Sequence, residues 1–492
     1  MPIPPIAPLV RLPLMLLAAG LAAGCTAGAD YQRPALPQAA QYLHQSAVGL
    51  RQDADAAELQ QWWTAFGDPR LTRLVTLALA QNLDLAQAAA RVRQARAALG
   101  AADAALLPSG NLDGQTARAY QSVQTPLGKV LDATPGFARA GSAHEVQLAA
   151  SWELDLFGGL RREREAARAD YEATAAGWAA ARLAVAAQTA DLYLTIQGLH
   201  TRLALARRQV DTQAAALDIA ALLYGKGLVN EPALRQAEAA LAQARAAMPG
   251  LETARDVALH ALDVMLGAAP GTHAQELPAS GIIALAPRIT AGATPGDLLR
   301  RRPDLIAAER RLAAASARTG AAVAEYYPKF NFGALFGSAT AGGALFGSGS
   351  GQAAGVLGLR WRLFDFGRIA AQIDAARGQE AELLAAYRLA ALHAAEDVEN
   401  ACSALLRHGE QATLLTQSVQ ALGRARAASL AAYEKGVTSR IEVLQADARL
   451  LRARDAHTQA QTASARAAVA AYRALGGGWQ VPQAGAESVA TR

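Results

Sequence analysis

Cysteine is almost absent from this chain of 492 residues, which contains only Cys25 and Cys402. A small scaffold held together by disulfides is therefore excluded. Aromatic residues make up only 5% of the chain, and its net charge is +5. Because no basic cluster is interleaved with aromatic residues, we expect no nucleic-acid partner.

Proline is missing from two long stretches, Gly159 to Tyr224 and Gly367 to Tyr433. Both are rich in Ala, Leu, Arg, Glu and Gln, which have high helix propensity. Each stretch predicts a helix of about 65 residues, on the order of 100 Å long at ~1.5 Å per residue. The chain is therefore predicted to be mainly α.

Patterns typical of enzymes are also missing. The eight histidines show no HExxH or other paired metal spacing. The run "GSGSG" at 347–351 has no strand–turn–helix context for a nucleophile. We therefore predict no catalytic residue, no metal and no cofactor apart from a covalent lipid, and we do not expect an enzyme.

The first 25 residues differ from the rest. Arg11 precedes the apolar run 12–24, which is too short to span a bilayer but suits a signal peptide. The run ends in "LAAGC", which resembles the cleavage box of bacterial lipoproteins. That resemblance implies a signal peptide at 1–24 and a lipidated, palmitate-bearing Cys25 that begins an extended segment, 25–70. The alternative is an ordinary signal peptide with an incidental cysteine.

The remainder is a tandem duplication. Rare residues recur at an offset of 209, as in Trp152 and Trp361, or Tyr224 and Tyr433. Upstream, the offset is 220, as in Pro108 and Pro328. We predict repeat one at 71–267, a linker at 268–290, repeat two at 291–476 and a tail at 477–492. Each repeat reads as helix, β-hairpin, long helix, turn and helix.

Strand-like alternation marks the hairpins. Apolar residues occupy every second position of 145–156, and 330–336 and 357–363 alternate likewise, whereas 110–120 alternates poorly. Four strands of about ten residues fit a transmembrane β-barrel, although two hairpins on a soluble sheet would give the same pattern. Four strands cannot close a barrel alone, so a barrel must be shared between protomers. The Gly/Ser-rich stretch 337–355 is predicted to be a flexible outer loop.

Several segments together resemble the outer-membrane factors of tripartite efflux pumps, which are TolC-like channels, and within them the NodT/OprM-like lipoprotein branch. The segments span nearly the whole mature chain: "DYQRPALP" (30–37), "QWWTAFGDPRL" (61–71), "NLDLAQAAARVRQARA" (82–97), "RRPDL" (301–305), "YYPKF" (326–330), "WRLFDFGR" (361–368), "YEKGVTSRIEVLQA" (433–446) and "ALGGGW" (474–479).

This resemblance implies a homotrimer in the outer membrane. Its 12-stranded transmembrane β-barrel, with four strands per protomer, would continue as a long periplasmic α-helical barrel. The expected partners are a periplasmic adaptor, or membrane fusion protein, an inner-membrane pump of RND type and outer-membrane lipid. The implied function is passive export of small toxic molecules, including antibiotics, from the periplasm.

The same resemblance implies two kinds of site. The turns between the long helices would form the periplasmic tip where the adaptor docks, with a plain helical hairpin as the simpler reading. The docking residues are Gly227, Leu228, Val229, Gly436, Val437, Thr438 and Ser439. Charged residues beyond the second turn are candidates for a gate or, equally, for ordinary surface pairs: Arg440, Glu442, Asp447 and Arg449.

Two other functions remain open from the sequence. The same fold serves as a duct for ATP-driven type I protein secretion. A coiled-coil surface lipoprotein would explain the helices and the lipid box, but it would leave the alternating segments around Trp152 and Trp361 unexplained.

Overall fold

A computed structural model describes residues 26–36, 42–43, 59–274, 276–277, 284–287 and 301–479. The predicted signal peptide, Cys25, parts of the predicted linker and most of the tail lie outside these residues. The chain divides into two compact units. Unit 1 combines 1–34, 93–173 and 309–386, and unit 2 combines 35–92, 174–308 and 387–492. Each unit therefore draws on both halves of the duplicated sequence.

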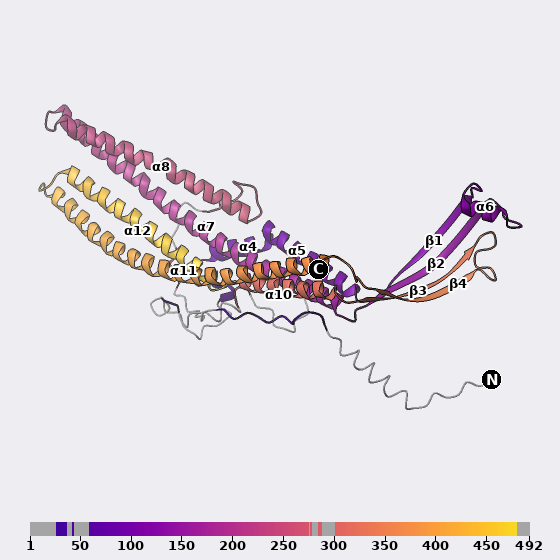
Figure 1. Ribbon diagram of the computed structural model, residues 1–492. Helices are drawn as coiled ribbons and strands as arrows, with labels where there is room; N and C mark the ends of the chain where they lie inside the picture. Colours follow the sequence, from indigo (N-terminus) through magenta and orange to yellow (C-terminus); the bar gives the residue numbers. More distant parts are fainter. Residues whose placement is uncertain are drawn as a thin grey trace. The chain divides into compact units, whose positions relative to one another are not determined.

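Unit 1 contains two β-hairpins joined in one antiparallel sheet of order β1-β2-β3-β4 (Figure 1). The strands are β1 (Ser109–Tyr120), β2 (Ala140–Leu154), β3 (Lys329–Thr340) and β4 (Gly351–Arg360). Strand β1 forms despite its weak alternation, because it pairs with β2 along its whole length. The strand order makes β1 and β4 the edge strands.

The connections at the hairpin ends differ. Between β1 and β2 lies a short helix, α6 (Pro126–Asp132), capped by Thr125, whose hydroxyl accepts from Gly128 N at 3.1 Å. The predicted loop 337–355 is too long: its ends belong to β3 and β4, whose ladder pairs Gly337 with Gln352. Glycine and serine misled the prediction because backbone pairing does not require large side chains.

Helices follow the strands in each repeat. Helix α7 (Gly159–Gly225) and helix α11 (Arg368–Glu434) each have 67 residues, and each passes through both units. Helices α5 (Leu83–Ala104) and α10 (Pro303–Ala324) also pass through both. No helix in the described part of the chain is long and apolar enough to cross a membrane.

In unit 1, alanines of α7 and α10 pack together, and one buried carboxylate of α10 binds the N-terminal segment. The side chain of Glu309 on α10 is 1% exposed and receives hydrogen bonds from Tyr31 (2.8 Å), Arg33 (3.2 Å) and Arg310 (2.6 Å). Burial raises the pKa of Glu309, but these hydrogen bonds and the charge of Arg310 outweigh it, so the pKa is lowered overall. The N-terminal segment is thereby fastened to α10.

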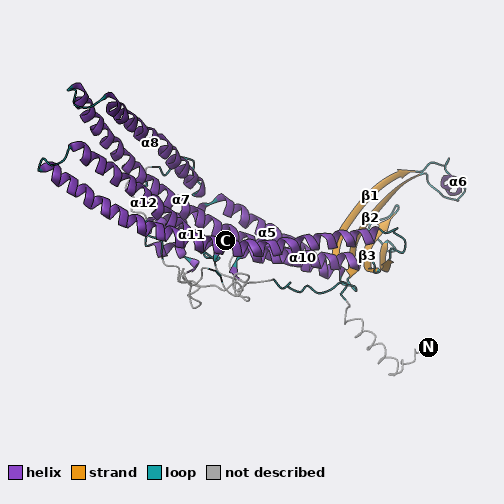
Figure 2. Ribbon diagram, turned by 60° about the vertical axis from the view of Figure 1, so that its left-hand side comes forward, coloured by secondary structure: helices purple, strands orange, loops and turns teal. Residues whose placement is uncertain are grey.

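The regular elements that the structure describes in unit 2 are all helices (Figure 2). It adds α4 (Pro69–Gln81), α8 (Glu231–Met265), α12 (Arg440–Ala474) and the 3-10 helix η2 (Trp62–Phe66). Helices α8 and α12 have 35 residues each. The apolar core includes Trp62, which stacks on Tyr472 of α12 with ring centroids 5.3 Å apart. Cys402 is buried in this core.

Within unit 2, one buried arginine links the beginning of repeat two to the end of α12. Arg302 pairs with Asp304 at 2.8 Å and Asp397 at 2.9 Å, and its guanidinium also donates to the carbonyl of Ala474 at the end of α12. Burial lowers the pKa of Arg302, but its hydrogen bonds to the two carboxylates more than compensate and raise it. The guanidinium thus stays charged and satisfies a carbonyl in the last turn of the helix.

Candidate functional site

The first turn joins α7 to α8 through Gly227, which has φ +69°. Gly227 N donates to the carbonyl of Tyr224, and Leu228 N donates to that of Leu223, both at 2.9 Å. These two bonds form a Schellman motif, which favours glycine because its left-handed conformation is costly for other residues. Asn230 then caps α8 by accepting from Ala233 N at 3.2 Å.

The second turn joins α11 to α12 with the same geometry. Gly436 has φ +73°, its N–H donates to the carbonyl of Tyr433, and Val437 N donates to that of Ala432, again at 2.9 Å. Here the cap is Ser439, whose hydroxyl accepts from Glu442 N at 3.3 Å. The sequence motif Tyr-x-Lys-Gly therefore encodes one turn twice.

Both turns leave apolar side chains in solvent. Leu228 is 67% exposed and Val437 is 79% exposed, although the residue at this position of a Schellman motif commonly packs against its own helix. Val229 and Thr438 are half-buried, and Ser439 is exposed. A Cβ atom placed on Gly227 or Gly436 would meet nothing within 4 Å. The turns therefore offer small and apolar groups to a partner.

The four gate candidates do not form one cluster. Arg440 lies over the ring of Tyr433, with its guanidinium carbon 5.6 Å from the centroid. Glu442, in the first turn of α12, accepts hydrogen bonds from Thr438 and from the N-cap residue Ser439 just before the helix. Arg449 is exposed and makes no ion pair within the described part of the chain. These three residues thus have separate surroundings.

Asp447 is different because it forms an ion pair between two helices. Its carboxylate accepts from Arg426 Nε of α11 at 2.7 Å, and the two side chains are 24% and 40% exposed. Sequence reasoning missed Arg426. A usable signal existed, since Arg426 and Asp447 lie almost equally far from Gly436, on the two arms of an antiparallel helical hairpin.

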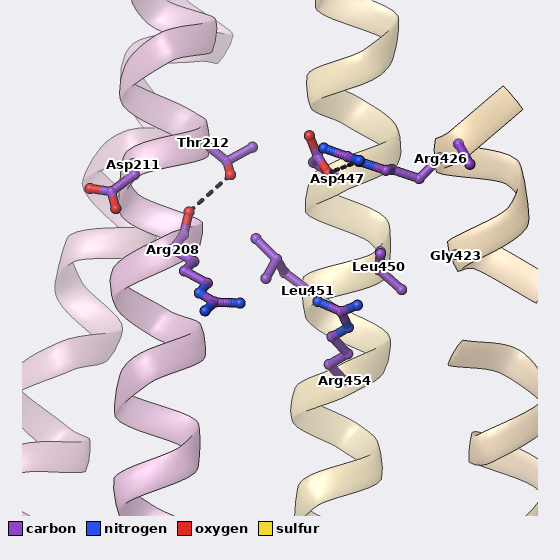
Figure 3. Close-up of a pocket in the computed structure, with 10 residues that line it drawn as sticks. Arg208, Asp211, Thr212, Gly423, Arg426, Asp447, Leu450, Leu451 and Arg454 are labelled. Atoms are coloured by element: carbon purple, nitrogen blue, oxygen red, sulfur yellow. Dashed lines mark hydrogen bonds and ion pairs between the residues drawn. The ribbon is translucent and has the colours of Figure 1, made fainter. Parts of the chain in front are cut away.

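This ion pair forms one wall of a groove of about 520 Å³ between α7, α11 and α12 (Figure 3). Arg208 and Arg454 extend into the groove from α7 and α12, whereas Asp211 points away from it. The groove is lined by Arg208, Asp211, Thr212, Gly423, Arg426, Ala427, Asp447, Leu450, Leu451 and Arg454. Its charged lining suits ion pairing between helices rather than binding of an apolar ligand.

Among the residues that the structure describes, no three His, Cys, Asp or Glu side chains are close enough together to hold a metal ion. The informative features are therefore the two turns, the ion pair behind them and the sheet with its two edges.

Comparison with known proteins identifies the family in which these features occur. The family model described as "Outer membrane efflux protein" matches residues 74–268 and 294–477. The chain belongs to this family. The pyoverdine export outer membrane protein OpmQ of Pseudomonas putida is 34% identical over 433 residues, covering 87% of this chain and 90% of the relative. The toluene efflux pump outer membrane protein TtgI, from another strain of the same species, is 31% identical over 467 residues, covering 94% and 97%.

A solved structure of the outer-membrane channel OprN agrees with the fold, with a TM-score of 0.80 at 29% identity, over 92% of this chain and 100% of that one. As a member of the outer membrane efflux protein family, the chain is an outer-membrane channel for efflux. The alternative of a type I secretion duct is not supported by these relatives. The resemblance inferred from the sequence motifs is confirmed.

Proposed function

We propose that three copies of the chain form one continuous export duct. The observation that carries this proposal is the four-stranded sheet with two edge strands in a member of an outer-membrane family. Open sheet edges are not tolerated in lipid, and small barrels need about eight strands. Three sheets of four strands each would close a 12-stranded barrel with no free edge.

In this proposal the long helices continue the duct into the periplasm as an α-helical barrel. The turns at Gly227 and Gly436 form its far tip, where a periplasmic adaptor would dock and link the channel to an inner-membrane pump of RND type. The exposed Leu228 and Val437 support this assignment, because they leave an apolar side chain at each turn for another protein to cover.

The duct would act passively, with no catalytic step of its own and no cofactor, on small toxic molecules. Relatives named for pyoverdine export and for toluene efflux support small-molecule cargo, although their two named substrates differ greatly in polarity. Such diversity fits a wide duct in which the pump selects the cargo. We also propose that Cys25 carries the lipid anchor, which the box "LAAGC" supports.

For the closed state we propose that Asp447 acts through Arg426. Of the four gate candidates, Asp447 alone forms an ion pair between α11 and α12 within the described part of the chain. An ion pair between two helices resists their separation, which opening of a helical barrel requires. Glu442 and Arg440 serve the turn, and Arg449 is the remaining charge available to a neighbouring copy.

Deletion of the gene tests the export proposal. We expect the deletion strain to become more susceptible to at least one class of toxic compound, and a plasmid copy of the wild-type gene to restore tolerance. A strain that also lacks paralogous channels, yet shows unchanged susceptibility across a broad panel, would refute small-molecule efflux.

A further inference from the structure

The two repeats are equivalent at the level of single hydrogen bonds. Trp152 Nε1 donates to the carbonyl of Leu106 at 2.9 Å, and Trp361 Nε1 donates to that of Tyr326 at 3.0 Å. The tryptophans are separated by 209 positions and the acceptors by 220 positions, as the sequence offsets require. Adding the offset to a residue number in repeat one therefore gives the structurally equivalent residue in repeat two.

The hairpin registers obey the same mapping. Ser109 of β1 lies opposite Ser151 of β2. Adding 220 to the first number and 209 to the second gives Lys329 and Arg360, which lie opposite each other in β3 and β4. Both hairpins thus share one register.

The two hairpins could meet at two equivalent junctions, β2 with β3 and β4 with β1. Only the β2–β3 junction is paired within one copy. Strand β2 pairs with β3 beyond the point where it leaves β1: its pairing with β1 ends at Ser151, and its pairing with β3 continues to Leu154. Strand β4 has no such second neighbour and stops at Arg360. The three residues that correspond to the end of β2, 361–363, are not in a strand.

An aromatic contact shows the same asymmetry. Phe157 after β2 stacks on Tyr327 before β3, with ring centroids 4.8 Å apart and planes at 15°. The equivalent residues are Phe366 after β4 and Leu107 before β1. Phe366 is 102% exposed and Leu107 is 65% exposed. The stacked pair at the β2–β3 junction thus corresponds to two apolar side chains that are both exposed within one copy.

We propose that β4 of one copy pairs with β1 of the next in the register of the β2–β3 junction, with Arg360 opposite Asp113 of the neighbouring copy. The register follows from Ser151 opposite Gly333 by the same offsets. It also extends β4 through residue 363 and places Phe366 against Leu107 of the neighbour. The proposal rests on the proposed function, in which copies share one barrel.

The chemistry of the facing residues agrees with this register. Arg360 and Asp113 carry opposite charges, and such cross-strand pairs stabilise a sheet. The next pair places Trp361 opposite Leu112, which are 52% and 73% exposed in the single copy. In these two pairs an apolar residue faces an apolar one and the two charged residues face each other, whereas a slip of one residue would place each side chain opposite one from the other face.

Cysteine pairs test the register in outer membranes. Directly opposite residues of an antiparallel pair have Cα atoms about 4.5–5.5 Å apart, within the range of a disulfide. We expect Asp113→Cys with Arg360→Cys to give covalent dimers and trimers on oxidation, several-fold faster than either single variant. The matched controls are Asn111→Cys or Gln115→Cys with Arg360→Cys, which keep the face but shift the register by two residues.

Faster crosslinking in either control pair would overturn the register. The register would also be wrong if none of the three pairs crosslinked in a protein that native mass spectrometry shows to contain three copies. A protein found as a monomer would instead refute the shared barrel itself. Charge reversal provides a second readout: Asp113→Arg and Arg360→Asp should each lower the temperature at which the trimer dissociates, and their combination should restore it. A combination no more stable than the single variants would refute the pairing.

Discussion

Replacing Asp447 by alanine should make the channel easier to open. The Arg426–Asp447 ion pair is partly exposed, at 2.7 Å, and pairs of this kind contribute about 0.2–1 kcal/mol each. Three copies give a sum of about 0.6–3 kcal/mol if the pairs act additively. At about 1.4 kcal/mol per factor of ten, the ratio of open to closed channels should rise about 3- to 150-fold.

Single-channel recording in planar bilayers measures this change as higher conductance or more frequent opening. Arg426→Ala should have the same effect, and the double variant should add little to either, because both single changes remove one interaction. Asp211→Ala is the matched control, since Asp211 lines the same groove but points away from it (Figure 3). The difference should shrink in about 1 M salt. If Asp447→Ala leaves the recordings unchanged, the constriction lies elsewhere and the reasoning fails.

Three further predictions concern single residues. Gly227→Ala should destabilise the protein by about 1–2 kcal/mol in thermal unfolding, because the left-handed conformation disfavours a Cβ atom. The control Gly225→Ala, at the end of α7, should be neutral or stabilising. Equal effects of the two substitutions would contradict the Schellman motif at Gly227. Burial, followed by the nearby Glu399 charge, raises the pKa of the Cys402 thiol to about 11, so maleimide at about pH 8 should label it only after denaturation, and rapid labelling of the folded protein would contradict its burial. Glu309→Gln should destabilise the protein by about 3 kcal/mol at about pH 7. Since the pKa of Glu309 is lowered from its ordinary 4.5, the extra stability of the wild type should be complete above pH 4.5 and should disappear as the pH falls through the lowered pKa. A stability difference that does not depend on pH would refute the ionic role.

Much of the fold could be predicted from the periodicity of apolar residues and from the spacing of rare residues. The offset of 209 between the two tryptophans is visible in the sequence, and the structure shows equivalent hydrogen bonds at both. The turns were recognisable because glycine after a long helix has a specific conformational role, which Gly227 and Gly436 fill. Long helices were predictable because alanine-rich composition and the absence of proline act locally.

Contacts between distant segments were not predictable in the same way. Arg302 reaches Asp397 and the carbonyl of Ala474, a set that no local spacing reveals. Helix α6 escaped notice because seven residues give too little periodicity to distinguish a helix from a loop. The partner of Asp447 depended on how two helices align across a turn, which the sequence shows only once the turn is placed.

Native mass spectrometry of the protein released from lipid nanodiscs tests the central claim most directly. We expect a complex of three chains, because three sheets of four strands each close the proposed 12-stranded barrel. A folded species with the mass of one chain in the membrane would contradict it, since its two sheet edges would then lie open in lipid.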